Sequence, residues 1–357
     1  MDILIMGAGA IGSLLAFRLG AAGHAITAVG RERYVRAVRD RGLLVEVDGR
    51  AMRAANLRAV ESVEGLDDRF DLVLITTKAF DTAVAAVQVQ PFVRQGALVA
   101  VVQNGVGGID VASGILGADR LYAGVITTPV EAIKPALIRP LLEKGGLGLA
   151  PVTPGQDVEA LSTVFTRSHL AVRSCASWQA LVWSKLMLNM IGNAIPAILD
   201  WPLERVYAHR SLYELERDAL CEARAVVRQM GLKLVSLPGY PVGPLVWMLC
   251  AAPSWVAHPI FRIAIPAGRG GKRPSLHIDL GRGRVQSEVE FLNGAVVRAG
   301  ERLGIPTPIN RALCEVLTGV ARGEVEWYAF QGQAGRLIRR AREGTVTHLT
   351  WSGPNHT

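Results

Sequence analysis

Short apolar runs alternate with amphipathic stretches over the first half of the chain, a pattern typical of a parallel sheet with crossover helices. Buried strands are predicted at residues 2–7, 25–30, 71–77, 97–103 and 121–128. Shorter β-like runs lie near 147–152 and 170–175. The alternating stretch 43–60, with Asp48-Gly49 as its turn, predicts an inserted hairpin. We therefore expect residues 1–175 to form an α/β domain.

After residue 175 the apolar positions take on helical spacing, and no run of strands follows. The helical stretches are residues 176–200, 210–231, 286–303 and 309–322. Ser287 and Glu290 fit the two ends of a capping box at the start of the third stretch. We expect an all-α domain at residues 176–331. The polar, Arg-rich remainder, residues 332–357, predicts a flexible tail.

Composition excludes several classes of protein. A chain of 357 residues that is 50% hydrophobic can bury a large core, so a mainly disordered protein is excluded. Its four cysteines form no C-x-x-C pair and its seven histidines show no ligand spacing, so we expect no metal site. The N-terminus lacks the basic region of a signal peptide, which favours a cytoplasmic protein.

One segment, residues 234–261, contains no charged side chain. It is long enough to cross a bilayer as a helix. Five prolines interrupt it, however, and each removes a backbone hydrogen bond that a membrane helix needs. We therefore expect no membrane span, and instead predict buried helical packing or an apolar pocket wall.

The net charge of +8 is concentrated in two places. Residues 262–284 hold six basic side chains and one acidic side chain. Residues 331–357 hold four basic side chains and one acidic side chain. In the rest of the chain the numbers of basic and acidic side chains are equal. Attraction of small anionic ligands explains this distribution, and no element typical of nucleic-acid recognition is present, so we expect no nucleic-acid partner.

A glycine motif, Gly7-Ala8-Gly9-Ala10-Ile11-Gly12, follows the first predicted strand and begins a helix. In a G-x-G-x-x-G motif the first glycine makes a tight turn, the second lets a pyrophosphate approach the backbone, and the third packs the helix against the strand. Strand, motif, helix and second strand occur in the required order. The sequence therefore predicts a Rossmann-type dinucleotide-binding domain.

The choice between NAD(H) and NADP(H) depends on the residues after the second strand. NAD enzymes usually place an acid there for the ribose 2′-hydroxyl. This chain has Gly30-Arg31-Glu32-Arg33, and the guanidiniums suit a 2′-phosphate. NADP(H) is favoured, although Glu32 bonded to a ribose and arginines that are merely surface residues are alternatives.

Only six of the 39 basic residues are lysines, so the lysines are enriched at positions that need a compact ammonium. Lys78 follows the strand 71–77, at the edge where α/β folds bind ligands. Lys185, Asn189 and Asn193 are four residues apart in an apolar helix, which predicts that they share one face. Together they suit a substrate carboxylate and carbonyl, unless Lys185 simply reaches solvent at a helix contact.

Asn104 lies in Gln103-Asn104-Gly105, directly after the strand 97–103. This tripeptide is either a simple turn or a second contributor to the same ligand-binding edge.

At this point the sequence resembles the ketopantoate reductase (2-dehydropantoate 2-reductase) family. The matching segments, in the family's order, are GAGAIG (7–12), Arg31, TTKAF (76–80), QNGVGG (103–108), WSKLMLNMIGNAI (183–195) and SEVEFLNGAVVRAGERLGIPTP (287–308). The resemblance covers roughly the first 320 residues. It implies a Rossmann domain joined to a helical domain, with NADPH reducing ketopantoate to pantoate on the route to pantothenate.

The resemblance also implies residue roles. Lys185 matches the general acid, and Asn189 and Asn193 match substrate-binding amides. Asn104 matches the asparagine where nicotinamide and substrate meet, Lys78 matches a lysine near the cofactor, and Ser275 approximately matches a substrate-binding serine. Glu288 matches a glutamate associated with cofactor and closure, although an acid in a first helical turn has a simpler explanation in the helix dipole.

Two departures from the family concern the substrate side. The stretch from Asn193 to Ser275 is longer and more apolar than usual, and the interval from Ser275 to Glu288 is one residue too long. A more hydrophobic 2-oxo acid is therefore an alternative substrate, and a non-catalytic NADP-binding module is an alternative function. As for partners, a homodimer is left open.

Overall fold

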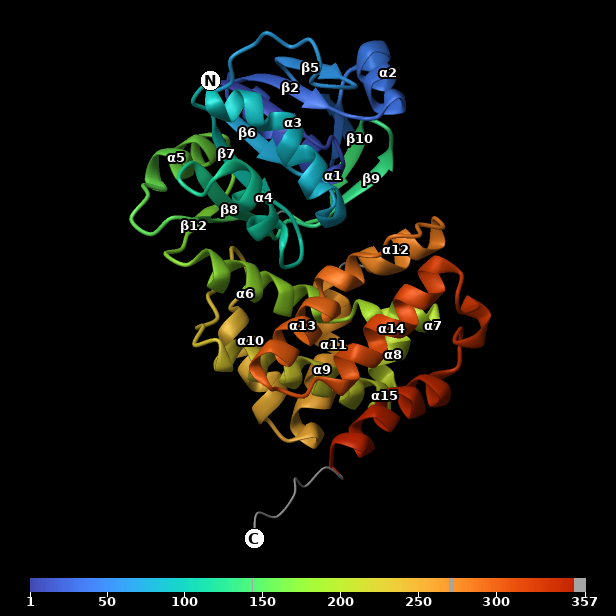
Figure 1. Cartoon of the computed structure of the whole chain (residues 1–357). Helices are drawn as coiled ribbons and strands as arrows, with labels where there is room; N and C mark the ends of the chain where they lie inside the picture. Colours follow the sequence, from blue (N-terminus) through green and yellow to red (C-terminus); the bar gives the residue numbers. More distant parts are fainter. Residues whose placement is uncertain (143, 270–272, 350–357) are drawn as a thin grey trace. The chain divides into compact units, whose positions relative to one another are not determined.

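A computed structural model describes residues 1–142, 144–269 and 273–349 of the chain, and its contacts divide them into two units (Figure 1). The first unit comprises residues 1–185 together with Val235–Pro241. That short return is fixed within the unit by Thr127 Oγ1, which donates to the carbonyl of Pro238 at 2.8 Å. The second unit holds the remaining residues. The boundary at Lys185 falls inside a helix, ten residues beyond the expected position.

The first unit is built on an eight-stranded sheet, as the apolar runs predict. Its strands lie in the order β12 (Val172–Ser174), β11 (Leu147–Pro151), β8 (Leu121–Ile126), β7 (Leu98–Val102), β6 (Leu72–Ile75), β1 (Asp2–Met6), β2 (Ala25–Val29) and β5 (Leu57–Val60). All neighbours are parallel except β8 and β11. The chain leaves β1 toward β2 and returns to β6 on the other side, so the strand order reverses at β1.

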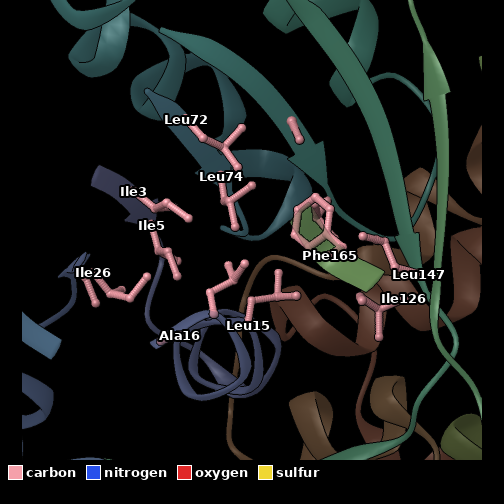
Figure 2. Close-up of a cluster of buried hydrophobic side chains, with 14 of the residues drawn as sticks. Ile3, Ile5, Leu15, Ala16, Ile26, Leu72, Leu74, Ile126, Leu147 and Phe165 are labelled. Carbon is pink, nitrogen blue, oxygen red and sulfur yellow. The ribbon is translucent and has the colours of Figure 1, made fainter. Parts of the chain in front are cut away.

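Both faces of the central strands are buried, which is why they are apolar without alternation. Figure 2 shows Ile3, Ile5, Leu72 and Leu74 packing on one face with Leu15 of helix α1 (Ala10–Ala21). The opposite face, with Leu4 and Val73, is equally buried. The other helices of this unit are α2 (Glu32–Arg41), η1 (Ala79–Asp81), α3 (Thr82–Arg94), α4 (Gly108–Leu116) and α5 (Glu159–Arg167).

A smaller sheet has the strand order β4 (Arg50–Arg53), β3 (Leu44–Val47), β10 (Leu137–Pro140) and β9 (Val130–Lys134). Asp48 and Gly49 both have positive φ, 49° and 74°, as a two-residue hairpin between β3 and β4 requires. The predicted hairpin is thus confirmed for residues 44–53. Its expected continuation, β5, instead joins the large sheet.

Helices α6 (Trp178–Met190) and α7 (Ala194–Leu199) occupy the stretch predicted as one helix at 176–200. The separation occurs at Gly192, whose φ of 62° is left-handed. Counted as one run, Trp178–Leu199 is long and apolar enough to cross a membrane. Yet 89% of its most apolar window is buried, which is typical of a core helix.

The second unit is helical over its described residues, as predicted. Besides α7 it contains α8 (Leu203–Ala208), α9 (Arg210–Gln229), α10 (Val242–Ala251), α11 (Ser254–Arg269), α12 (Ser275–Gly281), η2 (Glu288–Phe291), α13 (Asn293–Leu303), α14 (Pro308–Arg322), η3 (Trp327–Ala329) and α15 (Ala334–Leu349). The helix expected at 286–303 is divided into η2 and α13, because Leu292 leaves the helical conformation (φ −105°, ψ −95°).

The uncharged segment forms α10 and α11, and the expectation of buried packing holds for one side only. Val246, Leu249 and Phe261 are buried. Trp247, Trp255 and Ile263 are 60%, 75% and 74% exposed. These helices therefore pack by one face and present an apolar outer face.

The prediction of a flexible tail from residue 332 is wrong for residues 334–349. They form α15, which packs on α14 and α9 with Leu337 and Ala341 fully buried. The buried side chains described in α15 are two alanines and a single leucine. The helical spacing of apolar residues is therefore too weak to be recognised among the arginines. The rest of the expected tail, residues 350–357, lies outside the described residues.

Candidate active site

The glycine loop after β1 is fixed between the two neighbouring strands. The N–H groups of Gly7 and Ala8 donate to the carbonyl of Val29 at the end of β2, at 3.2 and 2.9 Å. On the other side, Thr76 Oγ1 after β6 donates to the carbonyl of Gly7 at 2.8 Å. Gly7 itself has a φ of 103°, which favours glycine. The loop is therefore anchored by both flanking strands before any ligand is present.

The two later glycines of the motif serve different purposes. A Cβ on Gly12 would lie 2.3 Å from the carbonyl oxygen of Gly7, so the helix approaches the loop too closely for any side chain. A Cβ on Gly9 would meet nothing within 4 Å. Within the described chain, no side chain caps the α1 N-terminus at Gly9. Open space thus faces the uncapped N–H groups of a helix start, as an anionic pyrophosphate requires.

Arg31 begins α2 directly after β2, and its side chain is exposed. A Cβ on the preceding Gly30 would lie 3.1 Å from Cβ of Ala8, so this corner adjoins the glycine loop. Glu32 and Arg33 are exposed as well. The exposed guanidinium groups of Arg31 and Arg33 therefore lie at a corner that adjoins the glycine loop.

The loops after β6 and β7 are joined by a residue whose role the sequence does not reveal. Gln103 donates from Nε2 to the carbonyl of Thr77 at 3.0 Å and to its hydroxyl at 3.1 Å. Its Oε1 accepts from Thr82 at 2.9 Å. Lys78 and Asn104 follow these braced positions, and both are half-buried. The braces fix the backbone from which these two side chains extend.

Lys185 and Asn189 lie one turn apart on α6, as predicted. Lys185 is 8% exposed and Asn189 is half-buried. The prediction that Asn193 continues the same helical face is wrong. The helix ends at Met190, and Asn193 has φ −125° and ψ −63° at the start of α7. The left-handed turn at Gly192 separates Asn193 from α6, although its side chain still bonds to the carbonyl of Asn189.

The same turn brings Asn193 to Ser275, which lies 82 positions further along the chain. Asn193 Nδ2 donates to Ser275 Oγ at 3.5 Å and to the carbonyl of Asn189 at 3.1 Å. Its Oδ1 accepts the N–H of Leu276 at 3.2 Å, so it caps the first turn of α12. Three residues expected at the substrate are therefore linked within the second unit.

Glu288 lies in the 3₁₀ helix η2 and is 5% exposed. Ser287 is the N-cap, as predicted, and its hydroxyl accepts the N–H of Val289 at 3.3 Å. The capping box is not completed, because Glu290 instead forms an ion pair with Arg322 at 2.6 Å. Glu288 is therefore the buried acidic residue of η2.

Two family models match the chain. One, described as ketopantoate reductase PanE/ApbA, matches residues 3–147, and its C-terminal counterpart matches residues 177–321. The chain belongs to the ketopantoate reductase PanE/ApbA family. The fold agrees with this assignment, since the first model covers most of the α/β unit and the second covers most of the helical one.

Relatives support an oxidoreductase of this family. The 2-dehydropantoate 2-reductase of Caulobacter vibrioides is 29% identical over 322 residues, covering 90% of this chain and 99% of that protein. The enzyme of the same name from Pyrococcus horikoshii is 26% identical over 315 residues, covering 87% and 94%.

Two solved structures are similar over most of the chain. A PanE/ApbA family ketopantoate reductase from Ralstonia eutropha JMP134 matches with TM-score 0.75 and 29% identity, covering 91% of this chain and 99% of that one. D-mandelate dehydrogenase with NADH and anilino(oxo)acetate shares the fold, with TM-score 0.78, 22% identity and coverage of 90% and 99%.

The two glycines of this ketopantoate reductase family loop should respond differently to alanine. We expect Gly12→Ala to lower the free energy of unfolding by about 2 kcal/mol or more, because the new methyl group meets backbone. Gly9→Ala should change it by less than about 1 kcal/mol, because its methyl group enters open space. Urea denaturation of both variants tests this, and equal losses would contradict the assigned geometry.

Proposed function

We propose that the protein reduces a 2-oxo acid to a 2-hydroxy acid with NADPH. The proposed substrate is 2-dehydropantoate (ketopantoate), which becomes (R)-pantoate in pantothenate biosynthesis. The observation that carries the proposal is the linked group of Asn189, Asn193 and Ser275, with Lys185 one turn away on α6. Amide and hydroxyl donors beside an ammonium suit the carboxylate and carbonyl of a 2-oxo acid.

The first unit fits a nicotinamide dinucleotide. The open space at Gly9 and the uncapped start of α1 suit the pyrophosphate, which the N–H groups of residues 8–12 would hold. Arg31 would contact the 2′-phosphate of NADPH, which is the basis for preferring NADPH over NADH. Lys78 and Asn104, at the ends of β6 and β7, would hold the nicotinamide half.

In the proposed reaction C2 of the oxo acid would accept the hydride that a bound NADPH would supply. Negative charge then grows on the former carbonyl oxygen. Lys185 stabilises that charge and donates the proton that completes the hydroxyl group. Asn189, Asn193 and Ser275 hold the carboxylate and the oxygen, which fixes the substrate for transfer. Glu288 would contact the coenzyme.

A more hydrophobic 2-oxo acid is the second candidate substrate. D-mandelate dehydrogenase, which shares the fold, was solved with an aromatic 2-oxo acid derivative, anilino(oxo)acetate, and NADH. The uncharged segment 234–261 supplies additional apolar surface to this chain. A larger apolar substituent on the oxo acid would find contacts there that a compact polar substrate does not need.

An assay of coenzyme oxidation with a panel of 2-oxo acids tests the proposed function. We expect NADPH oxidation with ketopantoate at a higher kcat/KM than with pyruvate or phenylglyoxylate. A preference for phenylglyoxylate would assign the second candidate instead. No oxidation with any 2-oxo acid, in a protein that still binds NADPH, would favour the non-catalytic module.

Lys185→Met should lower kcat by about two orders of magnitude or more, because the proton donor is lost while its space stays filled. Binding of NADPH, measured by fluorescence titration, should not change. Lys134→Met, at an exposed lysine on β9, is the matched control and should keep full activity. A Lys185→Met enzyme within tenfold of wild type would remove Lys185 from this role.

Arg31→Ala should raise the KM for NADPH about tenfold, as expected when a charge-assisted hydrogen bond to phosphate is lost. The KM for NADH should change less than about twofold, because NADH has no 2′-phosphate to lose. Steady-state kinetics with both coenzymes measure the difference, and Arg33→Ala shows whether its neighbour shares the contact. Equal effects on NADPH and NADH would contradict the assignment.

A further inference from the structure

The break between α6 and α7 depends on a buried hydrogen-bonding arrangement that lies outside the proposed reaction. At Gly192 the backbone is left-handed, and a Cβ there would lie 2.6 Å from Cδ2 of Leu203. The turn therefore excludes a side chain at this position. A buried turn also frees backbone N–H groups that a continuous helix would have paired, and each needs an acceptor.

Glu216 of α9 provides that acceptor. Its Oε1 accepts the N–H of Gly192 and the hydroxyl of Tyr207, the second residue from the end of α8. Glu216 is 5% exposed and Tyr207 is 1% exposed. A carboxylate in such surroundings costs stability unless hydrogen bonds compensate for its lost hydration.

The sequence places Glu216 where an apolar residue would be expected. It lies on the buried stripe of α9, between Leu212 and Ala219. Leucine or methionine at this position would bury its side chain without this cost. A carboxylate here indicates a specific task, and the turn at Gly192 is what it contacts.

The residue next to this turn is Asn193, whose side chain links Asn189, Ser275 and the first turn of α12. If the Gly192 N–H lost its acceptor, the turn could move, and Asn193 would move with it. The link between Asn193 and Ser275 thus depends on the peptide that Glu216 holds.

We propose that Glu216, itself oriented by Tyr207, is a positioning residue for substrate binding. It fixes the Gly192 turn so that Asn193 reaches Ser275 and both face the oxo acid together with Asn189. Glu216 acts through the backbone and does not touch the substrate. This inference rests on the proposed function, because Asn189, Asn193 and Ser275 are substrate residues only in that proposal.

The chain offers a matched control on the same helix. Glu222 is also largely buried, and it accepts the N–H groups of Ile309 and Asn310 at 2.9 and 3.0 Å, capping α14. Burial raises the pKa of Glu222 to about 6, despite these hydrogen bonds. It lies six residues beyond Glu216, ~9 Å along the helix. Replacing either glutamate removes a buried carboxylate that accepts backbone N–H groups, but only Glu216 adjoins Asn193.

The experiment compares Glu216→Gln, Tyr207→Phe and Glu222→Gln in the full-length enzyme. We expect Glu216→Gln to raise the KM for the 2-oxo acid about tenfold, the scale of one lost charge-assisted hydrogen bond, with kcat within about threefold of wild type. Tyr207→Phe removes only the hydroxyl group and should raise KM by about threefold. The Kd for NADPH should stay the same in all three variants. Glu222→Gln should lower the urea midpoint while leaving KM within about twofold.

Hydrogen–deuterium exchange provides a readout that does not depend on activity. Glu216→Gln should speed amide exchange in peptides covering residues 191–194, and Glu222→Gln should do so at residues 308–311 instead.

An unchanged KM in Glu216→Gln, or an equal rise in KM in Glu222→Gln, would overturn the proposal. If the wild type reduces no 2-oxo acid, the proposed function fails. The exchange data then decide alone whether Glu216 fixes the turn, and unchanged exchange at 191–194 overturns it.

Discussion

The break between α6 and α7 depends on one buried backbone N–H, that of Gly192. An unpaired donor in this position would cost stability, so the turn can exist only where an acceptor waits for it. Glu216 supplies that acceptor from another helix, and Tyr207 of a third helix donates its hydroxyl to the same carboxylate oxygen. Asn193, the next residue, accepts the N–H of Leu276 and so caps α12. The hydrogen bonds of this turn therefore connect α9 and α12 to the start of α7.

The α/β unit is organised by a different principle, in which neighbouring loops hold one another at one edge of a sheet. Val29, Thr76 and Gln103 each bond to a loop that belongs to a different strand. These bonds hold the glycine loop against the ends of β2 and β6, and the loop after β7 against the end of β6. Preorganisation of this kind lowers the ordering cost of binding. It also explains why a half-buried glutamine lies in a segment that otherwise looks like a simple turn.

The sequence predicted the large sheet because its strands are buried on both faces, and it predicted the glycine loop because each glycine has a separate steric reason. It did not predict β9 and β10. These short strands carry exposed residues such as Ile133, and they are stabilised by the pairing of β10 with distant β3 and of β9 with β10. Nor did it predict the break at Gly192, because one glycine interrupts an apolar helical pattern only weakly. The break also depends on Leu203 and Glu216, which lie elsewhere in the chain and contact the turn at Gly192. A signal for Glu216 was present, however, as an acid on the apolar stripe of α9.

Helix α6 has one further consequence. Lys185 belongs to the first unit and Asn189 to the second, yet both are carried by the same uninterrupted run of backbone hydrogen bonds. Their separation along the axis is fixed at about 6 Å by the helical rise. The spacing of the Lys185 ammonium and the Asn189 amide is thus a property of α6 alone.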